Sequence, residues 1–385
     1  MRILHLINLQ GFGGAERLFI EYLKNSSFNN EILCVSNNIN KNIEPELARF
    51  KINFVNKFAF TSIKYPSFLR KFILKKKIEK SKSDITIVWD FVPRISYKPK
   101  NTTLVYYDHG CSWQFQNNNK TQYFFSILDS AIAVSNASKR VMELRFNPKF
   151  NINVVVNRLP YILNKKIHYL KDGIITLGVA ARLVGLKGIG IAIITLKELQ
   201  NKNIKAKLII AGDGEQKENL ERLSKNLGIQ DSIEFLGYQS DMTSFYSKID
   251  IYLSTPILEA FGLSCIEALS NGVPVIFPIL NGQPEAVKDG YCGVGITPTL
   301  SIDEYHRLTG LNIDFSYDVY DPILDKLTEP KFISPHECVN NIIEIMNNYE
   351  SYSNNAINWS KKATDYKLFV YEFENCLNKL PSQTK

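Results

Sequence analysis

The chain has 385 residues and a formal net charge of +8, and 45% of its residues are hydrophobic, which is enough for the cores of two or three domains. Its six cysteines are scattered without paired spacing, which argues against a zinc site or a disulfide framework and favours a reducing compartment. No stretch reaches about 18 consecutive apolar residues, and the N-terminal segment is too short for a signal peptide, so we expect a cytoplasmic protein without a membrane-spanning helix.

The first elements are predicted to be a strand over 2–9 and a helix over 15–24, with a glycine-rich loop between them. Glycine lets the backbone approach a phosphate closely, so Gly13 and Gly14 are candidates for a phosphate-binding loop. Such a loop also suits a nicotinamide-dependent dehydrogenase. The G-x-G-x-x-G fingerprint of that class is broken, however, because its third glycine would fall on Glu16.

Residues 64–82 concentrate the positive charge, because eight lysines and arginines stand there against the single acid Glu79. Apolar residues including Phe68 and Phe72 recur at helical spacing, which predicts a basic amphipathic helix. We hypothesise that this helix binds an anionic membrane surface or a phosphorylated acceptor. The alternative is a solvated helix with one stripe facing the core. Nucleic acid is not expected as a partner, because no aromatic-rich recognition motif accompanies the charge.

Strands predicted over 31–36, 52–55, 85–89 and 103–107 alternate with helical or loop stretches, which is the pattern of parallel α/β units. The last of these strands leads almost directly into His109. Ligands of open parallel sheets bind beyond the carboxyl ends of the strands, so this histidine is a candidate site residue. The alternative is a packed, hydrogen-bonded loop histidine.

A polar and basic stretch over 160–172 is predicted to be a linker to a second α/β half. The first strand of that half is followed by Arg182 and Lys187. These two side chains suit a diphosphate, because a guanidinium pairs with two oxygens and an ammonium adds a point charge. They could equally be ordinary surface cations. Further along, Gly212 and Gly214 occupy a strand-to-helix turn, which either approaches a ligand or is plain turn chemistry.

Residues 251–278 predict a buried strand, a loop, a helix and a second buried strand. They carry Glu259 and Glu267, eight residues apart, with Gly262 where the helix should begin. A helix N-terminus presents unpaired N–H groups and the positive end of the helix dipole, so the loop is a candidate anion site with Glu259 at its mouth. Glutamate near a helix start is also an ordinary dipole partner, and the spacing alone does not decide between the two.

Residues 297–335 form a long stretch containing Tyr and Asp, and loops of this length in compact domains are typically functional or disordered. The aromatic residues argue against disorder, so we hypothesise that the stretch covers a cleft or an acceptor. The sequence contains no Asp-x-Asp pair after a strand and no His, Cys or carboxylate cluster with ligand spacing. We therefore expect no metal site.

Several of these stretches resemble the family-4 retaining glycosyltransferases of the GT-B fold. The segment Glu259-Ala260-Phe261-Gly262-Leu263 through Glu267 is similar to their E-x7-E motif. The resemblance covers nearly the whole chain and extends to Gly13-Gly14-Ala15-Glu16-Arg17, to Arg182 with Lys187, and to Gly212-Asp213-Gly214. It implies an α/β protein with the GT-B architecture, in which two Rossmann-like domains face each other across a cleft and a C-terminal helix crosses back to the first domain.

In that family the first glutamate of the motif faces the hydroxyls of the donor sugar and the second holds the ribose, which implies these roles for Glu259 and Glu267. Arg182 and Lys187 are implied to hold the donor diphosphate, and His109 to point at the donor sugar or the acceptor. The implied catalytic residues are Glu259, His109, Arg182 and Lys187. The implied donor-binding residues are Gly13, Gly14, Arg182, Lys187, Gly212, Gly214, Glu259, Phe261, Gly262, Leu263 and Glu267.

The resemblance implies transfer of a hexose or related sugar from a nucleotide sugar to a hydroxyl of a saccharide or glycolipid acceptor, with retention of configuration. The expected setting is the biosynthesis of lipopolysaccharide or another surface polysaccharide, with no metal and no cofactor. Two alternatives share the scaffold. A nucleotide-sugar epimerase would convert its donor with no acceptor present, and a non-catalytic nucleotide-sugar-binding protein would bind the donor without turnover.

We therefore expect an acceptor-binding domain over 1–163, joined by the C-terminal helix 366–385. The donor-binding domain is expected over 164–365, with an insertion at about 297–335. The membrane hypothesis for residues 64–82 would place the otherwise cytoplasmic protein at the inner face of the cytoplasmic membrane, as a peripheral protein. A monomer or a weak dimer is expected.

Overall fold

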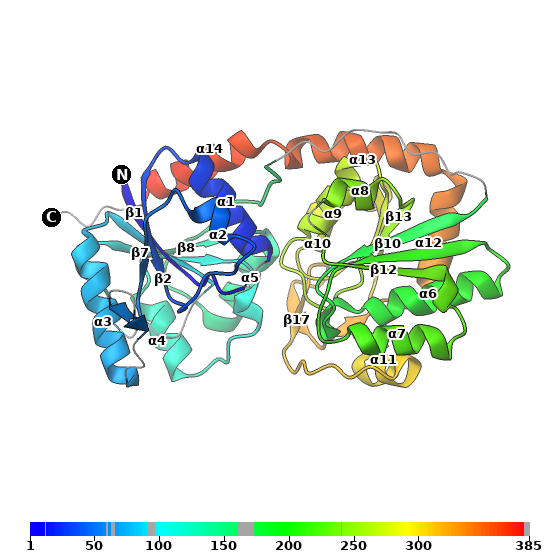
Figure 1. The fold of residues 1–385 in the computed structure, drawn as a ribbon, viewed down its shortest axis with the longest axis horizontal. Helices are drawn as coiled ribbons and strands as arrows, with labels where there is room; N and C mark the ends of the chain where they lie inside the picture. Colours follow the sequence, from blue (N-terminus) through cyan, green and yellow to red (C-terminus); the bar gives the residue numbers. More distant parts are fainter. Residues whose placement is uncertain are drawn as a thin grey trace. The chain divides into compact units, whose positions relative to one another are not determined.

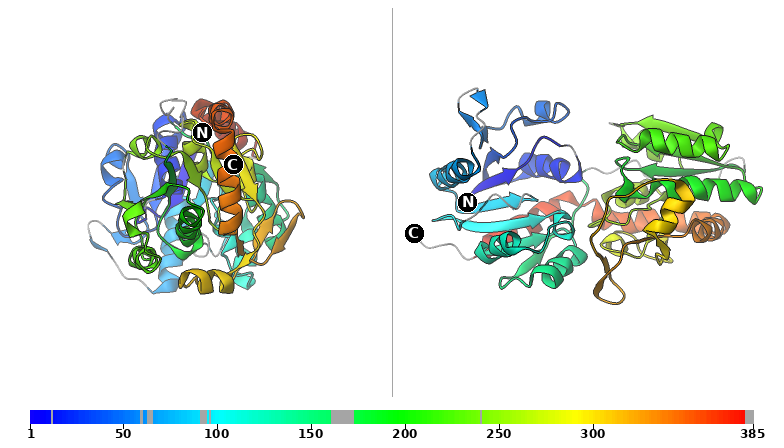
Figure 2. Two further views of the ribbon diagram at one scale, coloured as in Figure 1. Left: turned by 90° about the vertical axis from the view of Figure 1, so that its right-hand side faces the viewer. Right: turned by 90° about the horizontal axis from the view of Figure 1, so that it is seen from below.

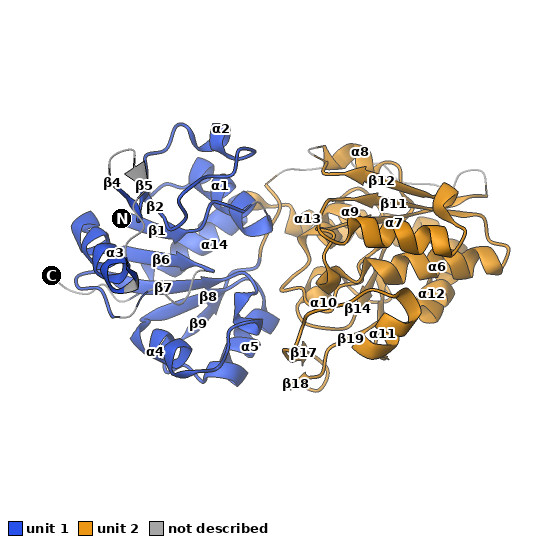
Figure 3. Cartoon of the chain, turned by 60° about the horizontal axis from the view of Figure 1, so that its bottom comes forward, with its two compact units in different colours: residues 1–156, 367–385 blue, residues 157–366 orange. Residues whose placement is uncertain are grey.

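The computed structural model consists of two compact units (Figure 3). Unit 1 contains Met1–Val156 and Lys367–Lys385, and unit 2 contains Asn157–Tyr366. The boundary predicted at 163 and most of the predicted linker fall outside the described residues. The structure describes residues 1–11, 13–58, 61–62, 66–90, 95, 97–160, 173–239 and 241–380.

Unit 1 is built on a sheet of seven parallel strands in the order β3-β2-β1-β6-β7-β8-β9. The sequences of β6 and β7, ITIVW and TLVYYD, are largely apolar, and every residue in them is buried. Such runs form central parallel strands, because helices cover both faces of the sheet (Figure 1). The strands are β1 (Arg2–Ile7), β2 (Asn29–Cys34), β3 (Ile52–Phe54), β6 (Ile85–Trp89), β7 (Thr103–Asp108), β8 (Ser130–Ala133) and β9 (Ile152–Val154), beside a short antiparallel pair, β4 (Lys57–Phe58) and β5 (Thr61–Ser62).

Local capping explains where two helices of unit 1 begin. The side chain of Asn118 accepts hydrogen bonds from the backbone N–H groups of Lys120 and Thr121 at the start of α4. Ser135 accepts one from the backbone N–H of Ser138 at the start of α5. The helical elements of this unit are α1 (Gly14–Asn25), α2 (Glu44–Leu47), α3 (Ser67–Ser81), η1 (Cys111–Trp113), α4 (Asn119–Ile127), α5 (Asn136–Phe146) and α14 (Tyr366–Asn378).

The C-terminal helix α14 packs on the sheet of unit 1, although more than two hundred residues separate it from β9 (Figures 1 and 2). Its Phe373 is fully buried, with ring centroids 4.9 Å from Tyr22 and 5.1 Å from Tyr107. The Glu374 carboxylate accepts hydrogen bonds from the backbone N–H of Ser27 at 2.9 Å and from its hydroxyl at 2.6 Å. The predicted return of the C-terminal helix to the first domain is therefore observed.

Unit 2 contains a second parallel sheet, in the order β12-β11-β10-β13-β14-β15. The chain winds outward from β10 in one direction and then returns to place β13 on the other side of β10. This reversal is a topological switch point, where ligands of doubly wound sheets bind. The strands are β10 (Ile175–Ala180), β11 (Ala206–Ala211), β12 (Ile233–Gly237), β13 (Ile251–Leu253), β14 (Val275–Pro278) and β15 (Gly293–Ile296).

Helices flank this sheet, and residues 189–196 of α6 are mostly apolar and all buried, as the core-facing part of a helix inside a domain should be. Among the described residues, no helix has both the length and the apolar character needed to cross a bilayer. The helical elements of unit 2 outside the insertion are η2 (Gly185–Lys187), α6 (Ile189–Asn201), α7 (Lys217–Asn226), η3 (Gln230–Ser232), α8 (Met242–Tyr246), α9 (Leu263–Ser270), α10 (Gln283–Ala286), α12 (Pro335–Asn347) and α13 (Tyr349–Ala363).

The insertion over 297–335 has secondary structure of its own, so treating it as a loop was wrong. Tyr305 and Phe332 stack with centroids 4.3 Å apart, and both are 1% exposed. A β-hairpin projects from it, with Ile323 67% and Leu324 59% exposed at its tip (Figure 2). Its elements are β16 (Leu300–Ser301), α11 (Ile302–Thr309), β17 (Val319–Asp321), β18 (Lys326–Thr328) and β19 (Lys331–Phe332).

The packing of α14 yields a stability prediction. Phe373→Ala should lower the free energy of unfolding of unit 1 by about 3–5 kcal/mol, because it empties a fully buried aromatic site. The matched control is Tyr371→Ala on the same helix, which is 67% exposed and should change stability by less than about 0.5 kcal/mol. Urea unfolding followed by tryptophan fluorescence measures both, and equal effects would contradict the packing role of α14.

Candidate functional site

The switch point of unit 2 brings together two of the predicted site residues. Lys187 ends η2 after β10, and Glu259 lies in the loop after β13. Lys187 Nζ donates to Glu259 Oε2 at 2.7 Å, and both side chains are 25% exposed. Partial burial strengthens such a charge-assisted hydrogen bond while both groups stay within reach of a ligand.

The backbones of these two loops are in direct contact. Thr255 Oγ1 donates to the carbonyl oxygen of Lys187 at 2.9 Å. The N–H of Ile257 donates to the carbonyl oxygen of Leu186 at 3.0 Å. Gly188 of the first loop has a φ of +60° and packs closely against the second loop. A Cβ at Gly188 would overlap the carbonyl oxygen of Thr255. Only glycine satisfies both the conformation and the approach. The spacing between Lys187 and Glu259 is therefore built into the main chain.

Arg182 lies in the same β10 loop, and its side chain is exposed. Within the described part of the chain, its guanidinium has no hydrogen-bond or ion-pair partner. The turn after β11 supports the loop, since the N–H of Leu183 donates to the carbonyl of Asp213 at 2.9 Å. Gly212 has a φ of +134°, and a Cβ there would overlap the carbonyl oxygen of Ala181. Gly214 follows in that turn, so these two glycines hold the loop that carries Arg182.

Helix α9 begins beside Glu259. Gly262 is its N-cap, with a φ of +111°, and supplies no side chain to cap the first N–H groups. Such a start is a site for an anion. The side chain of Phe261 is only 3% exposed, so it belongs to the core of the unit, whereas Leu263 is half-buried. Along the same helix, the half-buried Glu267 carboxylate accepts a hydrogen bond from Tyr246 Oη at 2.9 Å.

The insertion supports both site loops. Asn281 Oδ1 accepts from the N–H of Tyr320 at 2.9 Å, and Asn281 Nδ2 donates to the carbonyl of Ile257 in the Glu259 loop at 3.0 Å. On the other side, a Cβ at Gly188 would lie 2.7 Å from the ring of Phe332. The hypothesis that the insertion covers a cleft or an acceptor stays a prediction, but its packing against the two loops is clear.

His109 follows β7 in unit 1 and lies on an aromatic shelf. Its ring stacks on Trp89 with centroids 5.3 Å apart and planes 16° apart, and it also contacts Tyr107 at 4.2 Å. Burial lowers the pKa of His109 to about 3, so the ring is neutral at physiological pH. The buried Nε2 has no hydrogen-bond partner among the residues that the structure describes. A neutral imidazole in this state can bind a hydroxyl as donor or acceptor.

Two carboxyl groups, those of the buried Asp108 and the partly buried Asp90, lie beside His109, and sequence reasoning missed their contribution. Asp108 accepts from Tyr106 Oη at 2.8 Å and from Ser112 Oγ at 2.7 Å. Asp90 accepts from the N–H of His109 at 2.7 Å. Burial, and then the charge of Asp108, raise the pKa of Asp90 well above its usual range. The sequence did carry a signal, because Asp90 directly follows the predicted strand 85–89 and Asp108 directly follows the predicted strand 103–107.

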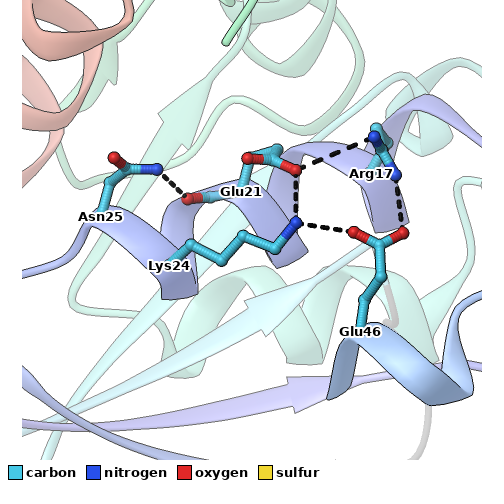
Figure 4. Close-up of polar contacts among 5 residues, drawn as sticks. All are labelled: Arg17, Glu21, Lys24, Asn25 and Glu46. Atoms are coloured by element: carbon cyan, nitrogen blue, oxygen red, sulfur yellow. Dashed lines mark hydrogen bonds and ion pairs between the residues drawn. The ribbon is translucent and has the colours of Figure 1, made fainter. Parts of the chain in front are cut away.

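The glycine-rich start of α1 was predicted to contribute Gly13 and Gly14. Gly13 is the N-cap and Gly14 is the first helical residue, and residue 12 lies outside the described part. The Arg17 guanidinium forms an ion pair with Glu46 of α2 at 2.7 Å and lies 3.9 Å from the carboxylate of Glu21 (Figure 4). The Arg17 side chain therefore ties α1 to α2.

The basic segment forms helix α3, but the apolar residues divide differently from the prediction. Leu74 and Ile78 face the core at 2% and 1% exposure, whereas Phe68 and Phe72 are 68% and 56% exposed. The exposed aromatics share the surface of the helix with its lysines, and Lys76 lies over the ring of Phe72. The helix therefore has both a core-facing stripe and an exposed basic, aromatic surface. Lys64 of the predicted segment lies outside the described residues.

Comparison with known proteins identifies the segment that carries the unit 2 site. Residues 163–309, which include Arg182, Lys187, Glu259 and Glu267, match the family model described as glycosyl transferases group 1. Over this segment, which is less than half of the chain, the sequence is similar to the group 1 glycosyl transferases. Within the described residues, no three His, Cys, Asp or Glu side chains gather in a way that could hold a metal ion.

The chain matches curated glycosyltransferases over part of their length. The O-antigen biosynthesis glycosyltransferase WclY of Escherichia coli is 34% identical over 140 residues, covering 34% of this chain and 38% of WclY. The N-acetyl-alpha-D-glucosaminyl L-malate synthase of Bacillus anthracis is 30% identical over 148 residues, covering 35% and 37%. The matched segments thus span less than half of these relatives.

Solved structures match nearly the whole chain. The apo form of the lipopolysaccharide outer core galactosyltransferase WaaB superimposes with a TM-score of 0.71 at 19% identity, covering 98% of this chain and 99% of WaaB. Anabaena HepE in complex with UDP and glucose gives a TM-score of 0.70 at 18% identity, covering 99% and 100%. At these identities the likeness concerns the fold, and it confirms the predicted GT-B fold.

The contact between the two site loops is testable at Gly188. Gly188→Ala should destabilise unit 2 by more than the cost of about 1–2 kcal/mol for a left-handed residue, because its Cβ also meets the carbonyl oxygen of Thr255. Gly228→Ala is the matched control, since Gly228 has a φ of +65° with nothing within 4 Å. Thermal and urea unfolding compare the two variants. Equal losses would show that Gly188 serves its own turn only.

Proposed function

We propose that this protein is a retaining glycosyltransferase that moves a hexose or related sugar from a nucleotide sugar to a hydroxyl of a saccharide or glycolipid acceptor. The observation that carries the proposal is the Lys187–Glu259 pair at the switch point of unit 2, inside the matched segment. A nucleotide sugar carries hydroxyl groups next to phosphate groups. Glu259 can accept hydrogen bonds from the sugar hydroxyls, and the neighbouring Lys187 can bind the phosphate. The start of α9 beside this pair has no side-chain cap, so its first N–H groups can bind a phosphate.

The charges of unit 2 suit a diphosphate leaving group. Lys187, the unpartnered Arg182 and the first N–H groups of α9 supply positive charge, and Glu259 supplies acceptors for sugar hydroxyls. Stabilising the charge that develops on the leaving group is usually the largest catalytic contribution. In this proposal the bond from the anomeric carbon to the diphosphate oxygen breaks on the face where the acceptor hydroxyl attacks. The hydroxyl proton passes to the departing diphosphate, and no metal is required.

His109 is proposed to contribute from unit 1 through its neutral imidazole. Its pKa of about 3 leaves Nε2 able to bind a hydroxyl of the donor sugar or of the acceptor, without adding charge. The GT-B relatives suggest the substrates to try first. WclY is named for O-antigen biosynthesis, WaaB for the lipopolysaccharide outer core, and HepE was solved with UDP and glucose. A uridine diphosphate sugar and a surface-glycan acceptor are therefore our first substrates.

The catalytic assignment is tested with Glu259→Gln, Arg182→Ala and Lys187→Ala. Each should reduce transfer by about 10²–10³-fold, because each removes a group that stabilises the departing diphosphate or orients the sugar. Transfer and thermal stabilisation are measured over a panel of nucleotide sugars and NAD, with and without EDTA. Lys225→Ala, an exposed lysine on α7, serves as the control and should retain full activity.

Other outcomes of this panel contradict the proposal. Near wild-type transfer in all three variants would exclude this site. Conversion of a donor in the absence of any acceptor would favour an epimerase, and donor binding without turnover would favour a binding protein. Loss of transfer with EDTA that returns with a divalent cation would overturn metal independence. Stabilisation by NAD alone would indicate a dehydrogenase.

We also propose that helix α3 holds the protein peripherally at an anionic membrane surface, where a glycolipid acceptor would lie. Two exposed phenylalanines can insert at the level of the headgroups while the surrounding lysines attract anionic lipid. The double variant Phe68→Ser, Phe72→Ser should weaken binding to vesicles containing phosphatidylglycerol by at least about tenfold, since each buried Phe contributes about 1.5–3 kcal/mol.

Sedimentation with vesicles measures this binding, and Tyr371→Ser is the matched control because Tyr371 is an equally exposed aromatic on another helix. Vesicles of phosphatidylcholine alone should bind weakly with every variant. Unchanged sedimentation of the double variant, or an equal loss with Tyr371→Ser, would exclude α3 as the membrane-binding surface.

A further inference from the structure

A buried tyrosine holds the second glutamate of the unit 2 site. Tyr246 ends α8 and is fully buried. Its hydroxyl donates to Glu267 Oε2 at 2.9 Å and lies 3.1 Å from the carbonyl oxygen of Ser264 in the first turn of α9. One phenol therefore contacts both the side chain of the glutamate and the start of the helix that carries it.

The surroundings of Tyr246 fix its hydroxyl in place. The side chain of Asp241 accepts hydrogen bonds from the backbone N–H groups that begin α8, and the Tyr246 ring packs against Phe245 and Tyr252 with centroids 4.9 Å and 6.0 Å away. Burial, and then the charge of Glu267, raise the pKa of Tyr246 well above its usual range. The phenol is therefore protonated at every pH at which the protein works, so it remains a donor to Glu267.

The other end of Glu267 is fixed as well. Its backbone carbonyl accepts from Ser270 Oγ at 2.9 Å and from Asn271 Nδ2 at 2.8 Å. A glutamate side chain with a fixed backbone still has three rotatable bonds, and ordering it costs free energy when a ligand binds. A donor that holds one carboxylate oxygen in advance removes part of that cost.

We propose that Tyr246 is a positioning residue for ribose recognition, which orients the Glu267 carboxylate toward the two ribose hydroxyls of a nucleotide. A carboxylate is an acceptor only, so it is suited to the paired hydroxyls of a ribose. The inference rests on the proposed function, because it takes a nucleotide sugar as the substrate, and it adopts the ribose contact that the family resemblance implies for Glu267. It adds a residue that lies outside the E-x7-E stretch and acts through that glutamate.

The experiment compares the Kd of UDP with that of 2′,3′-dideoxy-UDP by isothermal titration calorimetry. The wild type should prefer UDP, and Glu267→Gln should lose most of that preference. Tyr246→Phe should raise the Kd of UDP by about tenfold and leave that of the dideoxy analogue unchanged, since only ribose hydroxyls need the oriented carboxylate. The double variant Tyr246→Phe, Glu267→Gln should distinguish UDP from the dideoxy analogue no worse than Glu267→Gln alone does, because Tyr246 acts through Glu267.

Tyr252→Phe is the matched control. Tyr252 is also buried, packs beside Tyr246 and donates its hydroxyl to the carbonyl of Ala180 at 3.0 Å. It should leave the ratio of the two Kd values unchanged. If Tyr246→Phe fails to fold in thermal unfolding, Glu267→Asp replaces it, because the shorter side chain withdraws from the phenol and keeps its charge. It should lose the preference for UDP in the same way.

The outcomes separate the inference from the proposed function. If Tyr246→Phe keeps the wild-type ratio of the Kd values of UDP and dideoxy-UDP, the positioning role is overturned. It is also overturned if Tyr252→Phe changes that ratio as much as Tyr246→Phe does. In both cases ribose recognition by Glu267 stands. A Tyr246→Phe variant that weakens both ligands equally overturns it too, because the phenol then serves only the fold. A wild type that does not bind UDP, or does not distinguish it from the dideoxy analogue, overturns the assignment of Glu267 itself.

Discussion

The ion pair between Lys187 and Glu259 is the interaction on which the unit 2 site depends. It joins two loops that leave adjacent parallel strands in opposite winding directions, so it exists only because β10 and β13 are neighbours. Hydrogen bonds between the loop backbones keep the two charges at that spacing. A ligand that carries both phosphate and hydroxyl groups can then take over both charges without first bringing them together.

The candidate site residues of unit 2 are held in place by residues that have no proposed role in the reaction. The close approach at Gly188, the bridge from Asn281 to Tyr320, and the contact of Tyr246 with Glu267 each fix one piece of backbone or one side chain. The insertion therefore supports the site loops, and α8 supports α9, the helix that carries Glu267. Preorganised groups of this kind lower the ordering cost when a substrate binds.

Unit 1 carries the candidate site histidine, His109, on an aromatic shelf. His5 Nδ1 accepts a hydrogen bond from the Trp89 indole at 3.0 Å, and Trp89 in turn stacks on His109. Phe373 of α14 packs against the same shelf from the C-terminal end of the chain. The C-terminal helix thus shapes the surroundings of His109 as well as stabilising the unit that contains it.

The sequence by itself determined the two α/β halves, the loops that carry the site residues and the helix starts, because hydrophobic periodicity, glycine turns and capping are local properties. It also placed Arg182, Lys187, Glu259 and Glu267 in one half. Only the tertiary structure decided that Lys187 pairs with Glu259, that Arg17 is used by Glu46, and that Tyr246 holds Glu267. It also decided that 297–335 folds and which residues of α3 face the core. Each of these depends on contacts between residues far apart in the chain, which strand order and helix packing bring together and which no local pattern records.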